Sequence, residues 1–402
     1  MSRLVSLLIV LLAIAVATPV LAEQRLTLSG EMRVRGYSII APNYEKTSAD
    51  SQQYFDSRFR LIGRIAVAEG VSVHFLNDMS GTTTGNQWPN QVQQAGTRAW
   101  MNVDVGMVNM LVGKFQYALG NNIVYDQVQT GAVFTLKGAV PVQFAYFKHS
   151  DADRTMDDDI DTYTLNVAHS TDMYRANVFG GLLRNGAADV TKIYLVGTQA
   201  NFNLDPINVN FELNYFTGDN GASGAAKQDF KGLQAFVDVG AAVADNVTVG
   251  ARAYYARGYS DKADTTQTRA FADASGNWVP ESYGSMATLF STFDVAGNSA
   301  IFDPSGQGAG VLAIQPYATM KIMDPLTASV TAGYARPEEK NLPGAGNRVD
   351  LKSVYWANVS GTYTLATRTN LDGVVSYAKP SFRSNRDDDA RIVAGMRLRV
   401  NF

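Results

Sequence analysis

Apolar side chains recur at every second position along most of this chain, and this alternation constrains the fold more than any other feature. A period of two belongs to a β-strand, in which successive side chains point to opposite faces. In residues 390–402 the even positions are apolar, whereas Arg391, Arg397 and Arg399 stand at odd positions. Such a strand fits a barrel with lipid outside and water inside, and it also fits a soluble sandwich.

The same pattern recurs along the rest of the chain, at residues 26–35, 56–67, 207–215, 247–255 and 370–377. In two stretches, 108–116 and 191–204, the apolar phase shifts midway. An extra residue in one strand of a pair produces such a shift, so we predict a β-bulge in each stretch.

The connections between these segments alternate between short and long. Short turns are expected at 68–70, 106–107, 138–141, 170–172, 205–206, 244–246, 324–325 and 366–368. Longer polar stretches lie between them, and the longest spans 259–309. This order predicts an all-β fold, a transmembrane up-and-down antiparallel β-barrel of about 18 strands (16–18) with tight periplasmic turns, long external loops and periplasmic termini. Barrels of this size leave an aqueous channel.

Residues 1–22 are expected to be a cleaved signal peptide, and residues 23–402 the barrel, as a single domain. Arg3 precedes an apolar run at 4–17, Pro19 interrupts it, and Ala22 ends a small-residue cleavage site. No later apolar run approaches the roughly 20 residues that a membrane-spanning helix needs. In a membrane, the remaining chain must therefore close into a barrel, because only a barrel leaves no strand edge unpaired in lipid.

Composition excludes several classes of protein. Lys plus Arg number 34 and Asp plus Glu 37, which gives no basic surplus for nucleic acid. Cysteine is absent, which removes disulfides, thiol catalysis and thiolate metal sites. The three histidines, His74, His149 and His169, belong to no catalytic motif, so we expect no enzyme, no cofactor and no metal. An acidic run at 151–161 is either a solvated loop or a Ca²⁺ site.

The chain ends with a pattern that identifies a family. Phe402 is preceded by apolar residues at alternate positions, Val400, Leu398 and Met396. Together with the signal peptide and the hairpin alternation, this end resembles a Gram-negative porin or porin-like outer-membrane channel. The resemblance implies that Phe402, Val400 and Leu398 form the signal read by the barrel assembly machinery.

A second, more distant resemblance concerns residues 98–116. This segment looks like the strand-turn-strand hairpin of alginate-export-like barrels. Those often carry Gly-Arg-Gln where this chain has Gly113, Lys114, Phe115 and Gln116, so the resemblance does not extend to a polysaccharide substrate.

Arginines gather on the predicted inward side of the first, second and last strands. They are Arg33, Arg35, Arg58, Arg60, Arg64, Arg391, Arg397 and Arg399. Closure of the barrel makes these strands neighbours, so a basic ladder should line one wall of the pore. The ladder either selects anions or braces the barrel by pairing with acids such as Glu31 and Asp56.

The 259–309 loop carries more aromatic side chains than a loop wholly in water needs. They are Phe271, Trp278, Tyr283, Phe290, Phe293 and Phe302. Three interpretations stay open: the loop folds inward and narrows the pore through Trp278, Tyr283, Phe290 and Phe293, it caps the mouth, or it is disordered.

The sequence therefore predicts a porin in the outer membrane of a Gram-negative bacterium that lets small hydrophilic solutes diffuse through. The alternatives are a dedicated transporter of an anionic substrate, and a structural or adhesive barrel with a blocked lumen. Expected partners are outer-membrane lipid, the barrel assembly machinery and small solutes or anions, with no nucleic acid. The assembled state is a homotrimer or a monomer.

Overall fold

The computed structural model describes residues 25–40, 51–84, 93–150, 159–186, 190–223, 229–257, 266–267, 311–339, 351–385 and 388–402. All regular structure in these ranges is β-strand. The strands are β1 Leu26–Ile40, β2 Gln52–Ala68, β3 Val71–Thr84, β4 Gln93–Val105, β5 Val108–Leu119, β6 Tyr125–Leu136, β7 Val142–Ser150, β8 Ile160–Ser170, β9 Tyr174–Asn185, β10 Thr191–Leu204, β11 Ile207–Asp219, β12 Asp229–Ala244, β13 Val247–Ala256, β14 Thr266–Gln267, β15 Val311–Met323, β16 Leu326–Arg336, β17 Leu351–Ala366, β18 Thr369–Phe382 and β19 Arg391–Asn401. No helix in these ranges is long and apolar enough to cross a membrane.

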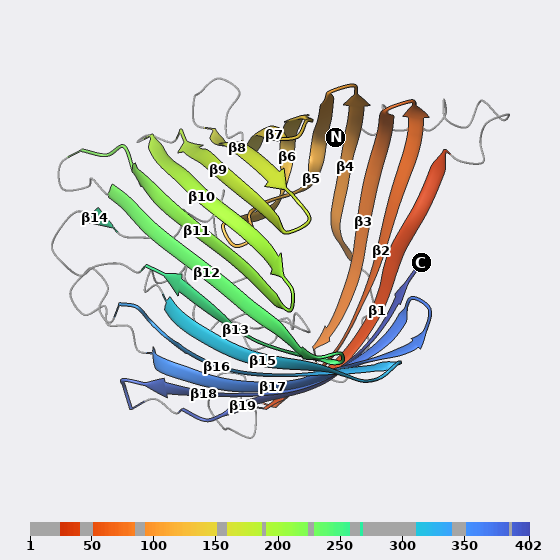
Figure 1. The fold of residues 1–402 in the computed structure, drawn as a ribbon, viewed down its shortest axis with the longest axis vertical. Coiled ribbons are helices and arrows are strands. Elements are labelled where there is room, and N and C mark those ends of the chain that lie inside the picture. The colour runs from red at the N-terminus through yellow and green to blue at the C-terminus, as the bar shows by residue number, and fades with distance from the viewer. Residues whose placement is uncertain are drawn as a thin grey trace.

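The strands close into a single ring (Figure 1). Each wall strand pairs antiparallel with its neighbours in sequence, and β1 pairs with β19 to close the barrel. The short strand β14 is not part of the wall, because it pairs in parallel with the start of β12 while β13 pairs directly with β15. The wall therefore has 18 strands, and the predicted up-and-down antiparallel barrel is confirmed.

The turns lie where the sequence places them. All eight predicted short turns fall between consecutive paired strands, as Gly70 does between β2 and β3. Gly70 and Gly106 have positive φ, as does Arg368 in the turn between β17 and β18. Tight turns need such backbone conformations, and glycine adopts them without steric cost.

The outer surface of the wall is apolar. Along β1, the even-numbered Leu28 and Met32 are exposed, while the odd-numbered Arg33 and Arg35 lie on the opposite, inner face. The same holds across the ring from β1, where Leu165 on β8 and Val196 on β10 are at least half exposed. A closed strand wall with exposed apolar side chains all round is suited to a hydrocarbon environment.

The chain end completes the seam between β1 and β19. The backbone N–H of Gly30 donates to the Phe402 carbonyl oxygen at 3.0 Å, and the Phe402 N–H donates to the Gly30 carbonyl oxygen at 3.1 Å. The Phe402 ring covers Gly30 and stacks on Phe59 of β2, with ring centroids 5.9 Å apart. The terminal residue therefore contacts both strands on the far side of the seam.

Candidate functional site: the barrel interior

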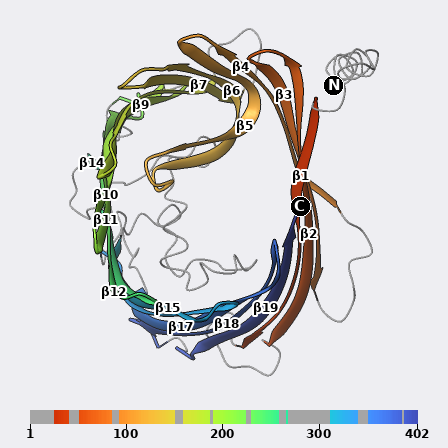
Figure 2. The ribbon, with the colours of Figure 1, turned by 45° about the vertical axis from the view of Figure 1, so that its right-hand side comes forward.

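The β5–β6 hairpin leaves the wall and enters the interior (Figure 2). Pairing between β4 and β5 ends at Ala99 and Lys114, and pairing between β6 and β7 begins only at Thr130 and Lys148. Between these points, β5 and β6 pair only with each other, as far as Leu119 and Tyr125. Residues 115–129 are thus an inward-folded hairpin, called here the lumen hairpin.

Two glycines stand where the lumen hairpin departs. Gly113 on β5 and Gly131 on β6 are direct cross-strand partners. A Cβ on Gly113 would lie 2.4 Å from the carbonyl oxygen of Ala99, and one on Gly131 would lie 2.0 Å from that of Tyr146. Gly113 also has a φ of 132°, which other residues rarely adopt. The bend therefore requires glycine on both strands, because the wall strands approach too closely for a side chain.

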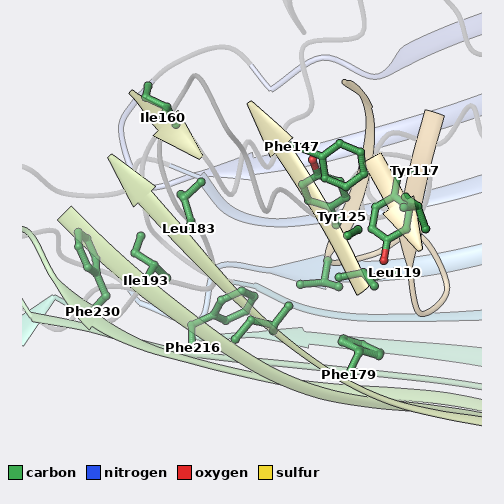
Figure 3. Packing of buried hydrophobic residues seen from close by; sticks show 14 of the residues in the cluster. Tyr117, Leu119, Tyr125, Phe147, Ile160, Phe179, Leu183, Ile193, Phe216 and Phe230 are labelled. Carbon is green, nitrogen blue, oxygen red and sulfur yellow. The ribbon is translucent and has the colours of Figure 1, made fainter. Parts of the chain in front are cut away.

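One face of the lumen hairpin packs against the inner wall (Figure 3). Phe115, Tyr117 and Tyr125 are buried, and all three rings lie against Phe147 of β7, with centroids 4.8–6.1 Å apart. Inner-face side chains of β9, β10, β11 and β12 complete the cluster, including Phe179, Leu183, Ile193, Leu195, Phe216 and Phe230. Burial of one such side chain contributes about 1.5–3 kcal/mol, so the hairpin is firmly held.

This packing corrects the two predicted β-bulges. The pairings of β5 and of β10 contain no register shift along 108–116 or 191–204. In β5 the apolar phase changes because the strand turns inward after Gly113 and buries its odd-numbered face. In β10 it changes because the inward Ile193 and Leu195 are covered by the hairpin cluster, whereas the inward Gln199 further along is polar. Both shifts of the apolar phase therefore reflect a change in what packs against the strand, and neither reflects an extra residue.

The tip of the lumen hairpin is tied to β11. The Asn121 backbone N–H donates to a carboxylate oxygen of Glu212 at 2.5 Å, and Asn214 donates to the other at 2.7 Å. The side-chain amides of Asn121 and Asn210 donate to each other's oxygens at 3.0 and 3.1 Å. Gly120 lies against the Glu212 carboxylate, where a Cβ would be 2.5 Å from an oxygen. Glu212 is only 1% exposed, so this anchor is shielded from water.

The other face of the lumen hairpin is open and polar. Lys114 and Gln116 are exposed, although their even positions match those of the lipid-facing Val108 and Val112 on the wall part of β5. Arg98 of β4 donates to Gln116 at 2.8 Å, and Gln116 donates to Asp126 at 2.6 Å. Polar bonds therefore tie the hairpin to β4, and others tie its tip to β11.

The predicted arginines lie in rows across the seam. Arg399, Arg33 and Arg58 are consecutive cross-strand neighbours on β19, β1 and β2. In an adjacent row Arg397 faces Arg35, which faces Asp56. These side chains therefore lie on adjoining strands of the wall.

Several of these arginines pair with carboxylates. Arg35 binds Asp56 through Nε and Nη2 at 2.5–3.0 Å, with both side chains buried. The other ion pairs are Arg58 with Glu31 at 2.5 Å, Arg60 with Asp78, and Arg397 with Asp372 at 2.7 Å. These pairs stabilise the wall, because removal of one partner would leave a shielded charge alone.

Two arginines of the ladder differ from these. Within the described ranges, Arg64 and Arg399 make no ion pair with any carboxylate, and Arg64 is exposed. Arg391, at the start of β19, is only 1% exposed. The ladder therefore contains both ion-paired arginines and arginines whose charge is not balanced by a carboxylate in direct contact.

Comparison with solved structures decides the fold. A BenF-like porin from Pseudomonas fluorescens Pf-5 matches with a TM-score of 0.61 and 11% identity, over 94% of this chain and 99% of that one. OccAB3 of Acinetobacter baumannii matches at 0.58 and 10%, over 94% and 99%. OccK5 (OpdH) of Pseudomonas aeruginosa matches at 0.56 and 13%, over 93% and 98%. The chain has the fold of an outer-membrane porin.

The porin fold confirms the predicted fold class. No protein-family model matches the chain, and no curated protein does. At 8–13% identity, the likeness to solved porins concerns the fold alone.

Several predicted features of this porin-fold chain lie outside the described residues. They are the signal peptide at 1–22, the loop at 259–309 apart from β14, with its Trp278, Tyr283, Phe290 and Phe293, and most of the acidic run at 151–161. The inward constriction proposed for that loop stays a prediction. The lumen hairpin, which the sequence did not predict, is an inward-folded element in the described part of the chain.

Proposed function

We propose that this porin-fold barrel is an outer-membrane channel through which small hydrophilic solutes diffuse passively, with a preference for anions. One observation carries the preference. Arg64 on β2 and Arg399 on β19 lie on the inner wall and make no ion pair with a carboxylate of the described residues, whereas Arg35, Arg58, Arg60 and Arg397 are ion-paired. These two arginines therefore add positive charge to the wall beyond the four pairs.

A positive wall raises the local anion concentration in a channel with low-dielectric walls. Salt screens this field over about 8 Å at physiological ionic strength, so a wide channel would be little affected at its centre. The lumen hairpin supports the proposal, because it occupies part of the interior and is bonded to Arg98, beside the ladder. Solutes that pass between the lumen hairpin and the arginine ladder therefore stay close to charged side chains.

Reversal potentials in a salt gradient test the proposal. Replacing Arg64 and Arg399 together by Ser removes two cations that have no acid partner among the residues that the structure describes. We expect the anion-to-cation permeability ratio to fall roughly two- to threefold, as it would if about half a kT of wall potential were lost, because anion entry falls while cation entry rises. Lys192→Ser is the control, because Lys192 lies on the outer face, and it should leave the ratio unchanged.

The ion-paired arginines allow a second experiment of the same kind. Replacing Arg58, Arg60 and Arg397 together by Ser frees Glu31, Asp78 and Asp372, so the ratio should move further toward cations. An unchanged ratio in both variants would show that the arginines only brace the wall. A folded barrel without conductance would favour the adhesive alternative, and saturation by a single anion would favour a dedicated transporter.

A further inference from the structure

The inner wall carries a second apolar surface, at the long-loop end of β13 and β15–β18, and β15, β17 and β18 lie across the ring from β5 and β6 (Figure 2). Its residues are cross-strand neighbours on these five strands. They are Tyr254, Ala313, Ala335, Val354, Trp356 and Ala378, called here the inner apolar belt. The belt faces inward, because positions that alternate with it, such as Leu312 and Tyr355, are exposed on the outer face.

The inner apolar belt is shielded from water. Ala335, Val354 and Ala378 are 0% exposed and Trp356 is 3% exposed. A barrel wall is one layer thick, so its inward side chains are shielded only where a further layer lies over them. On β7 and β9–β12 the lumen hairpin is that layer. Among the described residues, the cluster that contains the belt has one side chain from outside the wall strands, Ile123 at the hairpin tip, which is too small to cover five strands.

Polar atoms beside the belt also await a covering layer. Trp356 Nε1, Asn358 Oδ1 and Ser376 Oγ are buried on neighbouring rows of β17 and β18. None of the three atoms has a hydrogen-bond partner in the described part of the chain. Buried polar groups in native proteins are nearly always bonded. A polypeptide segment laid over the belt supplies apolar side chains to the belt and hydrogen-bonding groups to these atoms.

One segment of the chain fits this surface by position and composition. Residues 268–310 lie between β14 and β15 and lead directly into Val311, which is 0% exposed in the same apolar cluster. The segment carries six aromatic residues, whereas each other internal segment outside the described ranges carries one at most. It therefore ends at the edge of the belt and has the side chains that an apolar surface takes.

We propose that residues 268–310 dock on the inner apolar belt and form a second layer inside the wall of β13 and β15–β18. The aromatic side chains cover the belt, and groups of the segment bond Trp356 Nε1, Asn358 Oδ1 and Ser376 Oγ. This inference goes beyond the proposed function, because it does not depend on the charge of the permeating solute. It names the surface that receives the segment, which the sequence alone does not predict.

Labelling of single cysteines tests this proposal, because the chain contains no cysteine of its own. Ala335→Cys and Ala378→Cys report on the belt. Thr327→Cys is the matched control, since Thr327 is exposed on the same strand and face as Ala335. In the detergent-purified barrel, a charged methanethiosulfonate should react with the belt cysteines at least roughly tenfold more slowly than with the control, because a shielded thiol reacts only when its cover opens.

Two variants then identify the cover. Replacement of residues 268–310 by a short Gly-Ser linker should raise the rate at the belt cysteines to that of the control. In the full-length chain, Trp278→Ser, Phe290→Ser and Phe293→Ser together should raise it in part, whereas Ser291→Ala should leave it unchanged. Heat-modifiable gel mobility checks folding, and the full-length variant carries the test if the barrel with the linker does not fold.

Two results would overturn the proposal. Belt cysteines that react as fast as the control in the intact chain would show that the belt is open to water. Belt cysteines that stay slow in a folded barrel without residues 268–310, or in the full-length aromatic variant if the linker variant does not fold, would assign the cover to another part of the chain.

Discussion

At the scale of single residues, the C-terminal Phe402 shows how one side chain helps to close the barrel. Phe402 extends the β1–β19 ladder by two hydrogen bonds to Gly30 and covers that glycine with its ring. The sequence alone predicts a terminal aromatic, because the family pattern requires one. It does not predict the contact with Phe59, because the pairing of the first, second and last strands arises only when the ring closes.

Replacing Phe402 by Asp, or deleting it, should leave export intact and lower the amount of folded barrel in the outer membrane. Stacked rings contribute about 1 kcal/mol, so the ring contact alone would change the ratio of folded to unfolded barrel roughly fivefold. Heat-modifiable mobility of outer-membrane fractions measures the folded amount. Phe59→Leu is the matched variant, because it removes the stacking partner and keeps the terminal aromatic.

A large loss with Phe402→Asp and a small one with Phe59→Leu would show that the terminal residue acts as an assembly signal. Equal losses would assign its role to packing at the seam. Normal levels of folded protein in the Phe402 variant would contradict both.

At the scale of strands, local sequence chemistry predicts the turns well but does not predict tertiary contacts. Gly70, Pro206 and Pro325 mark turns because their backbone preferences are local. The lumen hairpin could not be read this way, since its apolar face is explained only by the wall that it covers. Its signal was present in the sequence: after Gly113, polar Lys114 and Gln116 occupy positions that face lipid in the wall.

Deleting the tip of the lumen hairpin, residues 117–125, should raise single-channel conductance while the barrel still folds. The reason is that this segment pairs only with itself and occupies the interior. Shortening the 259–309 loop is the parallel variant, and it should also raise conductance if that loop narrows the pore. Unchanged conductance with a folded barrel would show that the deleted segment does not limit flow.

Glu212 offers a finer version of the same experiment. Glu212→Ala removes both acceptors at the tip anchor, and a shielded donor without a partner costs about 1–3 kcal/mol. We expect noisier open-channel current and a conductance nearer that of the tip deletion. Glu212→Gln keeps one acceptor oxygen but turns an NH2 group toward the other donor, so its current should fall between those of the wild type and Glu212→Ala. Equal currents in all three proteins would show that the apolar packing alone fixes the hairpin.

At the scale of the whole molecule, the alternation of side chains and connections was sufficient to predict the closed wall and its 18 strands. The closed wall and its strand number both follow from the period-two pattern and from the turn residues, which can be read directly from the sequence. The division of the ladder into braced and unbraced arginines was not predictable, because it depends on register. A shift of one residue would have paired Arg399 with a different neighbour.

The field of the whole wall should make anion preference depend on salt. We expect the anion-to-cation permeability ratio to rise as ionic strength falls from 1 M toward about 0.01 M, because the screening length grows from about 3 to 30 Å. Arginine stays charged across this range and at any relevant pH, so the trend should not change between pH 5 and about 9. A ratio independent of salt would indicate selection by size instead.

The register at the seam also bears on aggregation during folding. Until β19 meets β1, both strands are free edges, and free edges recruit strands from other chains. Arg33 and Arg35 on β1 face Arg399 and Arg397 on β19, so the two edges repel each other while their charges are uncompensated. Asp56 of β2 and Asp372 of β18 neutralise one arginine on each side. We therefore expect each edge to join more readily once its own hairpin has formed, because each hairpin supplies one of these carboxylates.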